Sequence, residues 1–328
     1  MTPRLSLRIP RFLSNRIKLH LCETFIVHKI VALFGGKRAA DSLRKTVSGD
    51  ASGAPAWSAQ MAIGDDIGYF GPDSAVWQVH GCISTIVGGI RALLMQAAHP
   101  AALTGVAEHS QYDSDPLGRL ERTTRWLTIT SFGSTEAVAR EAQRVTEIHK
   151  RVVGNYPDGK NEVRPYAASD PRYLLWVHCA FTDSFLRTYQ ELGYDTQGIG
   201  DQYIGEWAQS AKPLGLNSAP LSMSELDAEI ARFVKDEVAA ITMTPPIVRF
   251  ILKPPFGKGG LFFYAILRNA AIATLDKPFL NVLGLKPRSK GWLKLSRVLL
   301  DFLSYLLGHE SPSQRIARER IKRIELAA

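Results

Sequence analysis

Residues 89–154 read GIRALLMQAAHPAALTGVAEHSQYDSDPLGRLERTTRWLTITSFGSTEAVAREAQRVTEIHKRVVG. Apolar residues of the kind that build helical cores fill most of this stretch, but His99, His109 and His149 interrupt them. A polar segment at residues 119–123 adds two arginines. Burying polar groups costs free energy unless each group finds a partner. The stretch therefore predicts a functional site set among core helices.

Capping and breaking residues mark the helix that leads into this stretch. Ser74, or Asp73 before it, is placed to cap a helix whose apolar stripe continues to residue 97. The glycine pair at 88–89 lets another backbone approach closely. Pro100 disfavours the helical conformation at His99, so the helix is expected to end there and to place His99 at a corner.

Two further helices are expected to start at Pro116 and Ser134, with Gly133 between them. In the second helix His149 shares one face with four apolar residues, which lie at steps of four and three: Val138, Ala142, Val145 and Val152. Gly154 is well placed to end this helix. His149 is therefore predicted to face the interior.

A later helix presents a second inward histidine. Asp170-Pro171 supplies a cap and a first-turn proline, and Gly193 follows the expected end. His178 lies on the apolar stripe of this helix. We therefore expect His178, like His149, to point inward.

Helical patterns continue to the C-terminus, and the main ones span residues 222–240, 261–274, 292–307 and 313–326. The sequence contains no run of alternating strands and no repeat. The predicted fold class is all-α. We expect a basic N-terminal arm over residues 1–57 and a single helical domain over residues 58–328.

The charge distribution is uneven along the 328 residues. Residues 1–50 carry a net charge of +7, residues 51–248 carry −8, and residues 249–328 carry +10. Basic ends favour contact with an anionic surface such as lipid headgroups, and the acidic middle argues against a nucleic-acid groove through the site. Lysines and arginines that only solvate helix faces would explain the same pattern.

The composition indicates the class of protein and its cellular compartment. Hydrophobic residues at 45% and charged residues at 22% are typical of a globular protein. No segment reaches the roughly 20 apolar residues that span a membrane, and the N-terminal part is expected to be a retained basic amphipathic helix. The three cysteines are widely spaced and indicate a reducing compartment. The expected location is cytoplasmic, with peripheral contact at the membrane.

Inward-facing histidines on separate helices suit a metal or haem site, because neutral imidazole is a versatile ligand. The spacings that indicate di-iron centres, zinc proteases, covalent haem, bound nucleotides or a nucleophile elbow are absent from the sequence. Non-covalent haem held by one histidine remains available. Each residue also has a structural explanation, since His178 would be satisfied by a helix carbonyl in a core, and Glu108-His109 would form an exposed pair at a helix end.

Three segments together resemble one family. They are LLMQAAHPAALTGVAEHSQYDSDPLGRLERTTRWLTITSFGS (93–134), RVTEIHKRVVG (144–154) and DPRYLLWVHCAFTDSFL (170–186). In this order they are similar to the rubber oxygenase (latex-clearing protein) and MpaB-type oxygenase family, over roughly residues 75–300. The resemblance implies a globin-related helical bundle with additional C-terminal helices, built around non-covalent haem b, which oxidises its substrate with dioxygen.

The resemblance assigns roles position by position. His149 matches the axial histidine that binds the haem iron, and Arg119 and Thr123 match a polar pair near the haem. Arg122 stands where rubber-cleaving members have a lysine that covers the distal side; a guanidinium stays charged and is a poor iron ligand. Glu108 matches the distal carboxylate.

His178 matches a second recurrent histidine in the family, with a supporting role near the cofactor. Arg119, Arg122 and Thr123 also recur at a helical spacing that would let them grip an anionic group together, although the two arginines would equally suit a solvated face.

These observations predict a haem b-dependent oxygenase that acts with dioxygen on a hydrophobic, unsaturated lipid or isoprenoid-like substrate, either a small molecule or a polymer. Glu108 or His109 would move protons or orient oxygen. Two alternatives stay open. One is a non-catalytic helical protein that binds haem or lipid. The other is a mononuclear non-haem metal enzyme that uses His99, His109, His149 and His178.

Overall fold

A computed structural model describes residues 55–109, 116–254 and 258–327, without the side chains of residues 116–121 and 258–259. The predicted N-terminal arm therefore lies almost entirely outside the described residues. In the described part the chain is helical apart from one short hairpin, which confirms the predicted all-α class.

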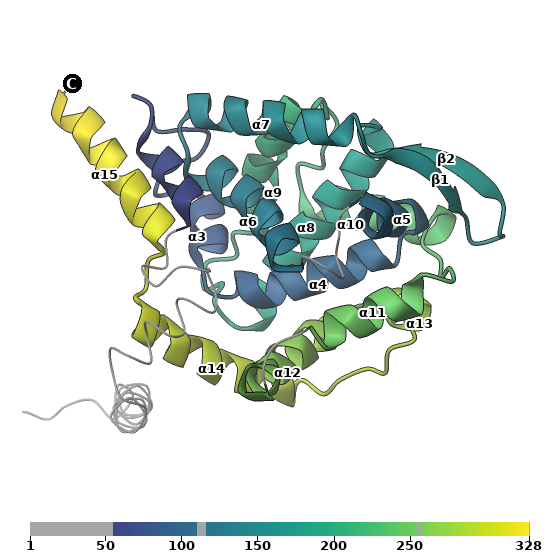
Figure 1. The fold of residues 1–328 in the computed structure, drawn as a ribbon. Coiled ribbons are helices and arrows are strands. Elements are labelled where there is room, and N and C mark those ends of the chain that lie inside the picture. The colour runs from purple at the N-terminus through teal and green to yellow at the C-terminus, as the bar shows by residue number, and fades with distance from the viewer. Residues whose placement is uncertain (1–54, 110–115, 255–257, 328) are drawn as a thin grey trace, which may run out of the picture. The chain divides into compact units, whose positions relative to one another are not determined.

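The elements follow one another along the chain, with α for α-helices, η for 3-10 helices and β for strands (Figure 1). They are η1 (Ala56–Ala62), α3 (Ala75–Gly81), α4 (Thr85–Ala97), α5 (Pro100–His109), α6 (Pro116–Phe132), α7 (Thr135–His149), β1 (Val153–Pro157), β2 (Val163–Ala167), α8 (Pro171–Glu191), α9 (Gly200–Trp207), η2 (Ala208–Leu214), α10 (Met223–Asp236), α11 (Thr244–Leu252), α12 (Lys258–Ala273), α13 (Lys277–Val282), α14 (Gly291–Leu307) and α15 (Pro312–Ala327).

Backbone contacts divide the chain into two compact units. One unit comprises residues 56–301 and 310–328 and contains the elements discussed below. The other comprises residues 1–55 and 302–309, of which only Pro55 and the region at the end of α14 are described.

Helices α4 and α8 form the centre of the larger unit, and α11 and α12 also pack on α4 (Figure 1). A Cβ added at Gly88 of α4 would come within 2.6 Å of the Phe185 ring of α8, so only glycine allows this approach. Buried Arg91 of α4 donates to Asp183 of α8 and ties the same pair of helices electrostatically. The close backbone approach expected at the glycine pair is thus found at α8.

The helix expected to run from residue 74 to residue 97 is broken into α3 and α4. Cys82 after α3 is extended, with φ −75° and ψ 140°, so the α-helical backbone cannot continue through it. Among the described residues no single helix is long and apolar enough to cross a membrane, although the pair α3 and α4, bent by 89°, has the length and composition together.

The hairpin of β1 and β2 was not predicted. Helix α7 ends at His149, so the expected continuation to Gly154 is wrong, and Gly154 instead pairs with Tyr166 across the antiparallel strands. The turn contains Asp158-Gly159, a dipeptide that favours tight hairpin turns. Two buried tyrosines, Tyr156 and Tyr166, put one side of the hairpin against the core.

Several predicted helix boundaries are confirmed by their capping bonds. The side chains of Ser134, Asp170 and Ser222 each accept a hydrogen bond from a backbone N–H in the first turn of α7, α8 and α10. Gly193 follows α8 with a φ of +75°, a left-handed conformation that glycine adopts without strain. His99 lies between α4 and α5, as the following proline predicts.

Candidate functional site

His149 is the last residue of α7, and its side chain is half-buried. Burial lowers the pKa of its imidazole. The C-terminal end of a helix favours a cation, but here the loss of solvation prevails, and the ring is neutral near pH 7. Among the described residues no hydrogen bond, ion pair or ring contact engages this side chain. His149 therefore presents an imidazole with a lone pair that is free to bind a metal.

Glu108 near the end of α5 is held by the hairpin. The phenol of Tyr166 donates a hydrogen bond of 2.9 Å to Glu108 Oε2. Burial, and then the bond to Glu108, raise the pKa of Tyr166, so the phenol keeps its proton. A Cβ at Gly154 would lie 3.0 Å from the Tyr166 ring and 3.2 Å from Glu108 Oε2, and one at Gly105 would lie 3.3 Å from the ring. The two glycines thus make room for this contact.

Sequence reasoning missed Tyr166, the residue that orients Glu108. The Asp-Gly turn followed by a short segment with a tyrosine was the signal that could have found it. His109 lies beside the same ring, edge-on, with ring centroids 6.4 Å apart. Glu108 and His109 are both exposed, as the alternative interpretation of an exposed pair at a helix end predicted.

The predicted polar group on α6 is only partly described. The side chain of Arg119 lies outside the described residues. Arg122 is exposed and Thr123 is half-buried, one residue further along the same helix. Their joint grip on an anionic group stays a prediction.

His178 points inward on α8, as predicted. Its ring stacks on Trp207 of α9 with centroids 6.4 Å apart and an interplanar angle of 9°. Burial lowers its pKa to about 4, so the ring is neutral. Its Nε2 atom is buried and has no hydrogen-bond partner, so the expected bond from this atom to a helix carbonyl is not found in the described part of the chain.

His80 of α3 forms a buried polar chain that the sequence did not reveal. Ser131 Oγ donates to Leu127 O at 2.6 Å and therefore accepts from His80 Nδ1, also at 2.6 Å. His80 Nε2 is then the acceptor for the hydroxyl of Tyr203, at 2.9 Å. Burial lowers the pKa of His80 to about 3, in agreement with this neutral form. The chain links α3, α6 and α9, and no local pattern predicts such a contact between distant residues.

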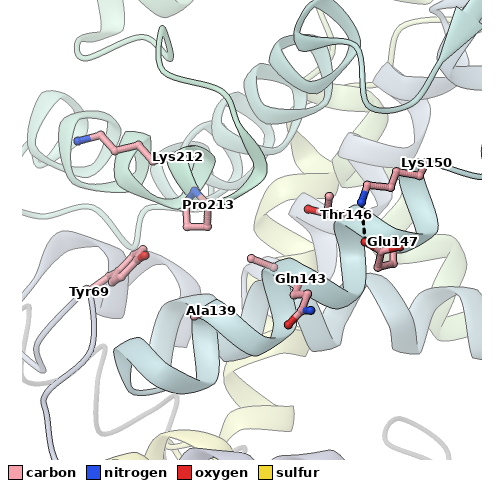
Figure 2. Close-up of a pocket in the computed structure, with 9 residues that line it drawn as sticks. Tyr69, Ala139, Gln143, Thr146, Glu147, Lys150, Lys212 and Pro213 are labelled. Carbon is pink, nitrogen blue, oxygen red and sulfur yellow. Dashed lines mark hydrogen bonds and ion pairs between the residues drawn. The ribbon is translucent and has the colours of Figure 1, made fainter.

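An open groove of about 570 Å³ runs between α7 and η2 (Figure 2). Its lining comprises Tyr69, Ala139, Ala142, Gln143, Thr146, Glu147, Lys150, Lys212 and Pro213. Lys150 pairs with Glu147 at 2.7 Å, whereas Lys212 has no ion-pair partner among the described residues. His149 is not among the residues that line this groove, although Lys150 beside it in the sequence is.

The four histidines of the non-haem alternative are not gathered at one place. Among the described residues no group of three or more His, Cys, Asp or Glu side chains could hold a metal ion. His99 is fully buried, its Nε2 bonds to Glu237 at 3.0 Å, and its Nδ1 accepts from the backbone of Ala102 at 3.4 Å. Both of its ring nitrogens are therefore occupied by structural bonds.

Together these observations define a helical protein in which a neutral imidazole at a helix end has no partner among the described residues, and a carboxylate is positioned by a tyrosine on the adjoining hairpin. The chain belongs to the family described as "ER-bound oxygenase mpaB/B'/Rubber oxygenase, catalytic domain", which matches residues 77–304. Family membership confirms the resemblance and assigns oxygenase chemistry, with dioxygen as a co-substrate. No curated protein and no solved structure matches the chain.

Proposed function

We propose that this oxygenase works with non-covalent haem b, whose iron is bound by His149. The observation that carries the proposal is the imidazole itself, which is neutral, half-buried and without a partner among the described residues. An iron ligand needs this protonation state, because a protonated ring has no lone pair to donate.

Several of the residues present have the chemistry that a haem group requires. A single neutral imidazole is a sufficient protein ligand for non-covalent haem. Thr123 and Arg122 on α6, with Arg119 one turn earlier, supply polar and cationic groups of the kind that hold propionates. In the part of the chain that the structure describes, the buried Nε2 of His178 has no hydrogen-bond partner and offers a second polar atom in the core. When bound, haem would supply the binding and activation of dioxygen.

Glu108 is the residue that we expect to handle protons. Tyr166 donates to one carboxylate oxygen and fixes its orientation, which leaves the other oxygen available to a substrate or to water. Since the phenol retains its own proton, it positions the carboxylate and does not compete with it for a proton. His109 stands on the same ring and is the alternative proton carrier.

The substrate that we propose is hydrophobic and unsaturated, of lipid or isoprenoid type. Support comes from the family, whose description includes rubber oxygenases, and rubber is an unsaturated isoprenoid polymer. The groove in Figure 2 offers apolar wall at Ala139 and Pro213, beside polar and charged residues.

Absorption spectra of the purified protein, before and after reconstitution with haem b, test the proposal. We expect a Soret band for the wild type and its loss or a marked shift in His149→Ala. His309→Ala, at an exposed histidine, is the matched control and should keep the band. A wild-type protein with no Soret band after reconstitution would refute the haem assignment.

A second candidate function is a haem- or lipid-binding protein without turnover. The exposure of Glu108 and His109 to solvent favours it, because oxygen activation is usually sheltered from water. Oxygen consumption with unsaturated lipids and polyisoprenes separates the two functions. The oxygenase should consume oxygen in proportion to the substrate, and a binding protein should consume none.

A further inference from the structure

Four large apolar side chains on α12 and α14 are exposed to solvent. They are Phe262 at 66%, Phe263 at 48%, Leu295 at 46% and Val298 at 63% of full exposure. The two phenylalanine rings contact each other edge to face, with centroids 5.7 Å apart. We call these four residues the α12–α14 face.

A hydrogen bond brings the two halves of this face together. Ser296 Oγ of α14 donates to the carbonyl of Ile266 in α12 at 3.1 Å. Leu295 and Val298 lie within two residues of Ser296, and both phenylalanines precede Ile266 by about one turn. The exposed apolar side chains therefore lie within about one turn of a hydrogen bond that joins α12 and α14.

Exposed cations lie close in sequence to the α14 part of the α12–α14 face. Lys286 and Arg288 precede α14, and Lys294 adjoins Leu295 in its first turn. All three are exposed, and none has a carboxylate partner among the described residues. Lys290, by contrast, pairs with Glu191 at 3.1 Å. Residues 249–328 as a whole carry a net charge of +10.

We infer that the α12–α14 face docks on the surface of an anionic lipid bilayer. Aromatic and aliphatic side chains gain free energy by entering the headgroup boundary, and lysines and arginines beside them are attracted to anionic lipids. A protein partner would need a matching acidic surface with an apolar centre, whereas a bilayer offers both properties everywhere. Docking goes beyond the oxygenase proposal and does not depend on haem or turnover.

The test is co-sedimentation of the full chain with lipid vesicles, either of phosphatidylcholine alone or with added phosphatidylglycerol. We expect binding to the anionic vesicles that weakens as salt is raised. The double substitution Phe262→Ser and Phe263→Ser should lower the partition coefficient by about tenfold or more. Lys286→Glu with Lys294→Glu should lower binding to the anionic vesicles and leave binding to the neutral ones little changed.

Matched controls remove exposed apolar side chains elsewhere. Leu221→Ser and Val163→Ser, at residues 59% and 75% exposed, should bind as the wild type does. Circular dichroism confirms that each variant is folded. If the double phenylalanine variant binds as tightly as the wild type, or if sedimentation shows that the face joins two copies of the chain, the inference is overturned. Neither result would affect the Soret test of the oxygenase.

Discussion

At the scale of single residues, two half-buried histidines, His80 and His178, have neutral rings in the native protein. Burial lowers their pKa values to about 3 and about 4, while an unfolded histidine titrates near pH 6.5. Below about pH 6.5 the unfolded chain binds protons that the native protein does not, so protonation favours unfolding. The stability from these rings is complete above that pH and declines as the pH falls toward 4.

We predict that the free energy of unfolding declines between pH 6 and pH 4 by about 1.4 kcal/mol per pH unit for each of the two rings. Denaturant melts at several pH values measure this slope. His178→Gln removes one titrating group, so it should reduce this slope by about 1.4 kcal/mol per pH unit. His309→Gln, at an exposed histidine, should leave the slope unchanged. A slope unchanged in His178→Gln would contradict the buried neutral ring.

At the scale of elements, the contact between α4 and α8 depends on one glycine of an adjacent pair. A Cβ at Gly88 would meet Phe185 Cδ1 at 2.6 Å, Thr188 Oγ1 at 2.9 Å and the Phe185 backbone at 3.3 Å. A Cβ at Gly89 would meet nothing within 4 Å. The two positions share a helix and differ only in the face that they present.

Gly88→Ala is therefore expected to destabilise the protein by about 1–3 kcal/mol, because α4 and α8 must separate or Phe185 must move. Gly89→Ala should be neutral or stabilise the protein by up to about 1 kcal/mol, since alanine is the better helix former. Thermal or urea unfolding of both variants provides the measurement. Equal effects at the two positions would show that the helices do not pack as closely as described.

The helix and strand boundaries show which features local sequence patterns can predict. Ser134, Asp170 and Ser222 were predictable as caps, because a cap depends only on its own helix. The break at Cys82 and the strand at Gly154 were missed. Next to Cys82, a Cβ at Gly81 would lie 2.1 Å from Gln314, so the break lies at a contact with a residue far along the chain. The strand at Gly154 pairs with Tyr166 in a local hairpin, which the Asp158-Gly159 turn could have indicated.

At the scale of the larger compact unit, Arg320 of α15 joins segments from its two ends. Its side chain is buried, and it donates to Met61 O at 2.7 Å and to Phe132 O at 3.1 Å. Burial lowers the pKa of its guanidinium. The Arg320 side chain thus joins α15 to η1 and to the end of α6 by hydrogen bonds to backbone carbonyls.

Arg320→Met should destabilise the protein by about 3 kcal/mol, because buried carbonyl groups lose their donors while the side chain keeps most of its volume. Arg323 donates to Ala62 O at 3.1 Å from an exposed position, so Arg323→Met is the matched control and should cost less than about 1 kcal/mol. Chemical denaturation compares them. If both variants lost the same free energy of unfolding, the buried hydrogen bonds of Arg320 would add no more stability than the exposed bond of Arg323.

The sequence by itself determined the helical class, most helix starts, the family, and the inward direction of His178. These properties depend on spacing within one helix or on the order of motifs, so they can be read from neighbouring residues. Tertiary structure alone decided that Tyr166 holds Glu108, that His80 bonds Ser131 and Tyr203, and that Ser296 of α14 bonds the carbonyl of Ile266 in α12. Each of these contacts joins residues far apart in the chain, and only packing brings them within bonding distance.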